Sequence, residues 1–143
     1  MIYCVRARNT VQFSVISPGG FCLLAAFGVA ARAFGQDFIV TSGTDGTHSG
    51  PLDPHELGRA YDGHSKDFSD KTAVILTVLK AADPSIEPFA LAGGYATNYF
   101  FMWLENEGTD NEHFHAQQRH GTEYPPVPQN NAENVQEAAV DEN

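Results

Sequence analysis

The feature that most restricts the fold of this chain is a pair of segments that together predict a β-hairpin. Residues 99–104, YFFMWL, form a strongly apolar run of strand length, and residues 112–117 return as its expected partner. Residues 106–111 lie between them and contain Asn, Gly, Thr and Asp, which favour a turn. The aromatic side chains of the first strand, Trp103 among them, are expected in the core.

The rest of the chain predicts two helices and three further strands. We expect strands over residues 11–16, 38–41 and 59–64, and helices over residues 21–34 and 69–81. Ser69 is expected to cap the second helix, and Asp83-Pro84 to end it. The order β, α, β, β, α, β, β predicts an α+β domain with a small, mostly antiparallel sheet and two main helices.

Length and composition indicate one folded domain followed by a tail. The chain has 143 residues, of which 42% are hydrophobic, and this suffices for a single domain with a real core. We expect the domain to cover residues 1–123. Residues 124–143 are rich in Pro, Gln, Asn and Glu and hold almost no core material, so they predict a disordered acidic tail.

One apolar segment, residues 21–31, bears on location. Its sequence, FCLLAAFGVAA, is too short to cross a bilayer as a helix, so no membrane span is expected. We interpret it as a buried helix. An export signal is the alternative, because Arg6 and Arg8 precede it. A cytoplasmic and a cell-wall-directed location therefore both stay open, as does the oligomeric state.

The charge balance excludes two classes of partner. The chain carries 18 acidic residues against 8 basic ones, for a formal net charge of -10. A protein of this charge does not bind nucleic-acid phosphates or anionic lipids through electrostatic attraction. We therefore expect neither as a partner.

The histidines carry the first chemical signal, because all six lie between positions 48 and 120. His113 and His115 alternate along the last predicted strand, which puts both imidazoles on one face. Such a pair is a common metal-ligand geometry. Taken alone, it is more often two surface histidines.

The segment DPHELGRAYD, residues 53–62, supplies the other half of a predicted metal site. His55 and Asp62 are separated by six residues that include two small ones, Gly58 and Ala60, which allow the backbone to turn tightly. Together with His115 they offer two imidazoles and one carboxylate, a set that suits Zn²⁺. Three protein ligands leave a fourth position for water, as in catalytic sites.

The same residues resemble a known family. HELGRAYD is similar to the S-x-H-x-x-G-x-A-x-D motif of the zinc D-alanyl-D-alanine carboxypeptidases and dipeptidases of the VanX and VanY type, whose fold is shared by the Hedgehog signalling domain. The resemblance implies that His55 and Asp62 bind zinc. It extends to EHFH, where the family places a Glu three residues before the third ligand. Glu112 is then the general base on the zinc-bound water, and His115 is the third ligand.

Further candidates come from the same resemblance, which covers residues 41–124. His113 corresponds to an auxiliary histidine beside the metal, and His48 and Asp67 match positions of the Hedgehog loop. The peptidases also carry an Arg shortly after the preceding strand, where it holds the substrate. Residues 42–45, SGTD, contain none, and Arg59 within the motif is the remaining basic candidate.

The expected function is zinc-dependent hydrolysis of an amide bond in a peptide of the peptidoglycan type. In this hypothesis Glu112 takes the proton of the water and returns it to the leaving amine, and His113 or His48 stabilises the developing oxyanion. The alternative is a zinc-binding recognition domain without hydrolase activity, as in Hedgehog. The missing Arg favours the alternative, and the presence of Glu112 favours the enzyme.

Overall fold

The computed structural model describes residues 2–46 and 50–126, and these form one seven-stranded sheet with two helices. His48 and residues 127–143 of the expected tail lie outside the described residues. The strand order in the sheet is β1-β2-β3-β7-β6-β5-β4. The strands are β1 (Val5–Ala7), β2 (Phe38–Ser42), β3 (Ala60–His64), β4 (Phe89–Leu91), β5 (Gly94–Ala96), β6 (Phe100–Glu105) and β7 (His113–Gln118).

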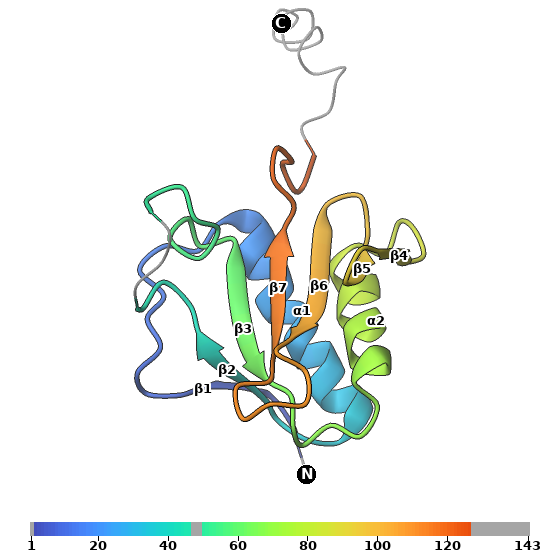
Figure 1. The fold of residues 1–143 in the computed structure, drawn as a ribbon. Coiled ribbons are helices and arrows are strands. Elements are labelled where there is room, and N and C mark those ends of the chain that lie inside the picture. The colour runs from blue at the N-terminus through green and yellow to red at the C-terminus, as the bar shows by residue number, and fades with distance from the viewer. Residues whose placement is uncertain (1, 47–49, 127–143) are drawn as a thin grey trace, which may run out of the picture.

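Both helices, α1 (Pro18–Phe34) and α2 (Lys71–Ala82), cover the same face of the sheet (Figure 1). The opposite face carries no helix in the described part of the chain. Apart from the parallel pair of β1 and β2, neighbouring strands run antiparallel. The expected α+β class, with a mostly antiparallel sheet and two main helices, is confirmed at this level. No helix among the described residues is both long and apolar enough to cross a membrane.

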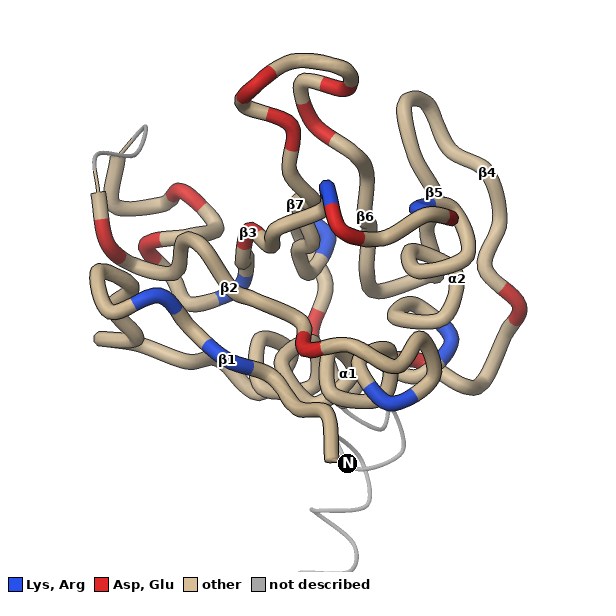
Figure 2. Tube along the Cα trace, turned by 90° about the horizontal axis from the view of Figure 1, so that it is seen from below, with Lys and Arg blue, Asp and Glu red and all other residues tan. Residues whose placement is uncertain are grey.

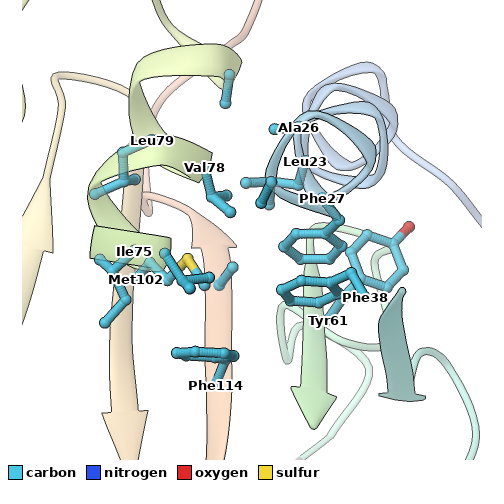
Figure 3. Close-up of a cluster of buried hydrophobic side chains, with 14 of the residues drawn as sticks. Leu23, Ala26, Phe27, Phe38, Tyr61, Ile75, Val78, Leu79, Met102 and Phe114 are labelled. Atoms are coloured by element: carbon cyan, nitrogen blue, oxygen red, sulfur yellow. The ribbon is translucent and has the colours of Figure 1, made fainter. Parts of the chain in front are cut away.

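The core lies between the two helices and the sheet (Figure 3). Phe27 of α1 stacks on Phe38 of β2, with ring centroids 4.2 Å apart and planes 8° from parallel. Each fully buried side chain of this kind contributes about 1.5–3 kcal/mol through removal of apolar surface from water. The side chains that complete this layer include Leu23, Ala26, Tyr61, Ile75, Val78, Leu79, Met102 and Phe114.

Strand periodicity then decides which face carries polar groups. In β7, Phe114 and Ala116 are buried in the core, so the alternate residues His113, His115 and Gln117 point to the face without helices. The hairpin of β6 and β7 forms as predicted, with the two strands paired from Phe100 to Glu105. It therefore holds a row of polar side chains on the open face.

Local side-chain chemistry starts both helices. Ser17 caps α1 by accepting a hydrogen bond from the backbone N–H of Gly20 at 2.9 Å. Asp70 caps α2 by accepting from the N–H of Ala73 at 3.1 Å. Ser69 was the predicted cap, so that prediction is wrong by one residue. Because Asp and Ser are both good caps, sequence alone does not separate neighbouring candidates.

The strand predicted over residues 11–16 is wrong. This segment makes no ladder with the sheet, and the N–H of Ser14 instead donates to Oγ1 of Thr44 at 3.0 Å. Of its apolar residues Val11 packs against the core, whereas Val15 is 49% exposed and Ile16 is 43% exposed. The edge position beside β2 is taken by β1, and the short strands β4 and β5 were not predicted.

The residue that follows the expected boundary at 123 contacts the core. Tyr124, assigned to the tail from composition, packs edge-on against Phe100 with ring centroids 5.0 Å apart, and contacts Tyr99 at 5.2 Å. Tyr124 is therefore partly buried against the core. A single aromatic residue in a polar segment leaves no composition signal, although it adds a ring to the core.

Candidate metal centre

Two of the predicted ligands are brought together by the central strand pair. Register places Asp62 of β3 directly opposite His115 of β7. Their side chains both point to the open face, and Oδ1 of Asp62 lies 2.9 Å from Nδ1 of His115. Antiparallel pairing thus joins residues 53 positions apart in the sequence.

The third ligand, His55, comes from the loop before β3. Its Nε2 lies 3.5 Å from Oδ1 of Asp62, and its ring lies edge-on to that of His115, with centroids 5.1 Å apart. Asp53 accepts a hydrogen bond from the backbone N–H of His55 at 2.9 Å. One ligand atom from each of His55, Asp62 and His115 lies within 4.8 Å of the others.

Gly58 anchors this loop to the body of the domain. Its φ of 68° lies in the left-handed region, and a Cβ there would collide with the carbonyl of Val15. Its own carbonyl accepts hydrogen bonds from the backbone N–H and the hydroxyl of Ser17, both at 3.1 Å. The N-cap of α1 therefore fixes the loop that presents His55.

The second nitrogen of each imidazole already has a partner, and this decides where the lone pairs point. Nδ1 of His55 lies 3.0 Å from the carbonyl oxygen of Gly43, and Nε2 of His115 lies 2.9 Å from Oε1 of Gln117. If these nitrogens donate, the lone pairs of the other two face Oδ1 of Asp62. Ligand histidines are usually oriented by such an outer acceptor. Three acceptor atoms that converge in this way suit a divalent cation.

The charges of the group are coupled. Burial would raise the pKa of Asp62, but the contacts of its carboxylate with the imidazoles of His115 and His55 hold it well below its ordinary value. Burial would lower the pKa of His55, but the carboxylate of Asp62 and the carbonyl of Gly43 raise it overall. Asp62 is therefore a carboxylate at neutral pH. The group is compatible with a metal ion, and its donor set does not by itself identify zinc.

A groove of about 610 Å³ lies beside the group. His55 and His115 form one part of its wall, and Leu52 and Trp103 form an apolar part. The ring of Trp103 packs on His115 with centroids 4.1 Å apart. The expectation that Trp103 lies in the core is wrong, because it alternates with the buried Phe100 and Met102 and faces the open side. Strand parity, counted from Phe100, is the signal that could have placed it there.

A second, more polar hollow of about 360 Å³ lies on the other side of Asp62. It is bordered by side chains of both charges. These are Arg8, Asp62, His64, Lys66, Asp110, Glu112 and His113, together with the uncharged Thr41, Ser42 and Asn111. Figure 2 shows that acidic residues gather on the loop between β6 and β7. Asp110 and Glu112 of this loop border the hollow.

Glu112 is not part of the three-ligand group. It directly precedes β7 and borders the polar hollow. Its carboxylate accepts from the hydroxyl of Ser65 at 2.6 Å and from the N–H of Gly108 at 3.1 Å, and lies 3.7 Å from Nζ of Lys71. These contacts, with the Ser65 bond foremost, hold the pKa of Glu112 below its ordinary value.

The remaining candidates separate into those near the metal group and those elsewhere. His113 lies near it, with Nε2 3.7 Å from Oδ2 of Asp62. Arg59 is directed away, since its guanidinium donates to the carbonyls of Arg119 and Thr122 at 2.9 and 3.0 Å. Asp67 is largely exposed and lies 3.4 Å from Nε2 of His64. The structure brings neither Arg59 nor Asp67 to the group.

Comparison of the chain with protein-family models, curated proteins and solved structures finds no match. The resemblance to the zinc peptidases therefore depends on the motif residues alone, and the metal group depends on the geometry described above.

Proposed function

We propose that this protein is a zinc-dependent peptidase that hydrolyses an amide bond of a peptidoglycan-type peptide. The observation that carries the proposal is the convergence of His55, Asp62 and His115 at the wall of an open groove. Three ligands beside a groove leave room for a water and a substrate. When bound there, zinc would supply a Lewis acid and a water of lowered pKa.

We assign a different part of the substrate to the groove and to the polar hollow. The groove offers Trp103 and Leu52 to an apolar part of the peptide. The polar hollow contains Arg8 and Lys66, which are the groups we assign to a substrate carboxylate. Arg8 directly follows β1, and it would take the role of the substrate-binding Arg that residues 42–45 lack. His113 borders the polar hollow 3.7 Å from Asp62, and in the chain with a single metal ion it is suited to stabilise negative charge on the substrate.

Proton transfer is assigned to Glu112. Its carboxylate borders the same hollow as Asp62, which supports the assignment. To reach a water at the metal group it has to exchange its bonds to Ser65 and Gly108 for a bond to that water. The proposal thus requires a side-chain rotation when substrate or metal binds.

A second candidate function is a zinc-binding recognition domain without hydrolase activity. The specific observation in its favour is the three-way engagement of Glu112 by Ser65, Gly108 and Lys71. In this alternative, these contacts make Glu112 a structural group rather than a base.

The deciding experiment is hydrolysis of a panel of muropeptides by the zinc-loaded chain, by Glu112→Gln and by His115→Ala. The enzyme proposal expects cleavage by wild type, none by His115→Ala, and a loss of about 100-fold or more in Glu112→Gln with zinc retained. His120→Ala, at the rim of the groove, is the control for removal of an imidazole. Zinc-loaded wild type that cleaves nothing in the panel supports the recognition domain.

A further inference from the structure

A second group of potential ligands lies next to the first and shares one residue with it. Asp62, Glu105 and His113 each offer a ligand atom, and these atoms lie within 4.8 Å of one another. Nε2 of His113 is 2.8 Å from Oε1 of Glu105 and 3.7 Å from Oδ2 of Asp62. Register explains the proximity, because Glu105 of β6 is paired directly with His113 of β7.

The two oxygens of Asp62 point to different groups. Oδ1 faces His55 and His115, whereas Oδ2 faces His113. A carboxylate with one oxygen toward each of two neighbouring groups is the arrangement of a bridging ligand in two-metal sites, where the ions lie roughly 3.5–4 Å apart. Asp62 is 18% exposed in its side chain, so both oxygens are held within the sheet face rather than free in solvent.

The hydrogen-bond partners of His113 leave Nε2 as the ring atom that faces the group. Nδ1 of His113 lies 2.7 Å from the carbonyl oxygen of Asn111, which can only accept, so Nδ1 carries a proton. Nε2, the other ring nitrogen, faces oxygens of Glu105 and Asp62, so one ligand atom from each of the three residues converges on the same place. The polar hollow gives an ion access from solvent, since Asp62 and His113 both border it.

We infer that Asp62, Glu105 and His113 form a second divalent-metal site, bridged through Asp62 to the site of His55 and His115. One imidazole and two carboxylates suit Zn²⁺ or Mn²⁺. The inference rests on the proposed metal site, because Asp62 is shared, but it is independent of hydrolysis. Neither the family resemblance nor the motif spacing contains Glu105.

The test is metal uptake by the full chain, with Glu105→Gln as the variant. Gln keeps the shape of Glu105, and this side chain is 41% exposed, so the variant is expected to fold. Glu107→Gln removes a neighbouring carboxylate of the same hairpin that lies outside the group, which makes it the matched control. After equilibrium dialysis against Zn²⁺, we expect about two equivalents in wild type and Glu107→Gln, and about one in Glu105→Gln.

Electron paramagnetic resonance of the Mn²⁺-loaded chain gives a second readout. Two ions bridged by a carboxylate are magnetically coupled, so wild type is expected to show a coupled spectrum and Glu105→Gln the spectrum of isolated ions. A single equivalent in wild type, or equal uptake in wild type and Glu105→Gln, overturns the inference. Failure to cleave muropeptides would overturn the peptidase proposal and leave these stoichiometries unchanged.

Discussion

Asp62 and His115 face each other across the two central strands, with Oδ1 of Asp62 2.9 Å from Nδ1 of His115. The carboxylate also lies 3.5 Å from Nε2 of His55, so it joins a strand ligand to a loop ligand. Asp62 is therefore the residue on which the candidate centre depends most. The predictions below follow from its surroundings and from the packing that supports them.

Asp62→Asn is expected to weaken Zn²⁺ binding by more than about 100-fold, because a neutral amide oxygen replaces the charged ligand at the centre of the group. Isothermal titration calorimetry measures the change. Asp67→Asn alters an exposed carboxylate of the same segment and should bind as wild type does. Equal affinities for all three proteins would show that Asp62 is not a ligand.

Gln117→Leu is expected to weaken Zn²⁺ binding by about 10–100-fold without a loss of fold. The physical reason is the 2.9 Å contact of Gln117 Oε1 with Nε2 of His115, which directs the opposite nitrogen to Asp62. Gln117→Glu keeps an acceptor at this place, so its affinity should stay near that of wild type. If Leu and Glu at this position weaken binding equally, the side chain does not orient His115.

Glu112→Gln is expected to destabilise the metal-free protein by about 1–2 kcal/mol at pH 7, because charge-assisted hydrogen bonds to Ser65 and Gly108 are lost. The pKa of Glu112 is lowered in the folded state. Its contribution is therefore present above the unfolded pKa of about 4.3 and is lost as the pH falls through the folded value.

Urea denaturation of wild type and Glu112→Gln at neutral and acidic pH checks this. The difference in the free energy of unfolding should shrink steadily below about pH 4. A constant difference across this range would mean that the ionised carboxylate is not the stabilising form.

Phe27→Ala is expected to cost about 3–5 kcal/mol in the free energy of unfolding. Phe27 is fully buried and stacks on Phe38, so its removal leaves a cavity between α1 and the sheet. Phe21→Ala on the same helix is the control, because Phe21 is 65% exposed and should cost less than about 0.5 kcal/mol. Similar costs for both would contradict the packing of α1.

Gly58→Ala is expected to destabilise the fold by several kcal/mol and to weaken metal binding as the His55 loop shifts. It combines a left-handed φ with a collision against the Val15 carbonyl. Gly46→Ala is the matched control. Gly46 has a φ of 85°, and no atom of the described residues lies within 4 Å of a Cβ placed there. It should cost only about 1–2 kcal/mol from backbone strain. If thermal denaturation shows the same loss of stability in both variants, the predicted collision of the added Cβ with the Val15 carbonyl does not occur.

Much of the secondary structure was predictable because it depends on local pattern. The apolar run 99–104 and its partner form the expected hairpin, and the segments near β2, β3 and both helices lie close to their predicted bounds. The strand predicted over residues 11–16 from its alternating apolar residues does not form. The backbone N–H of Ser14 in this segment donates a hydrogen bond to the side chain of Thr44 instead of to a neighbouring strand. Prediction also missed β1, β4 and β5, because a strand of three residues has too little periodicity to detect.

The sequence by itself determined the ligand types and their spacing along the chain. It placed His113 and His115 on one face of β7, and His55 and Asp62 at the two ends of a segment that contains Gly58 and Ala60. Only the tertiary structure decided which side chains meet. Register placed Asp62 opposite His115 and Glu105 opposite His113. Side-chain hydrogen bonds direct Glu112 to Ser65 and Arg59 to the carbonyl of Arg119. The physical reason is that strand pairing and side-chain hydrogen bonds join residues far apart in the chain, and local periodicity carries no information about such partners.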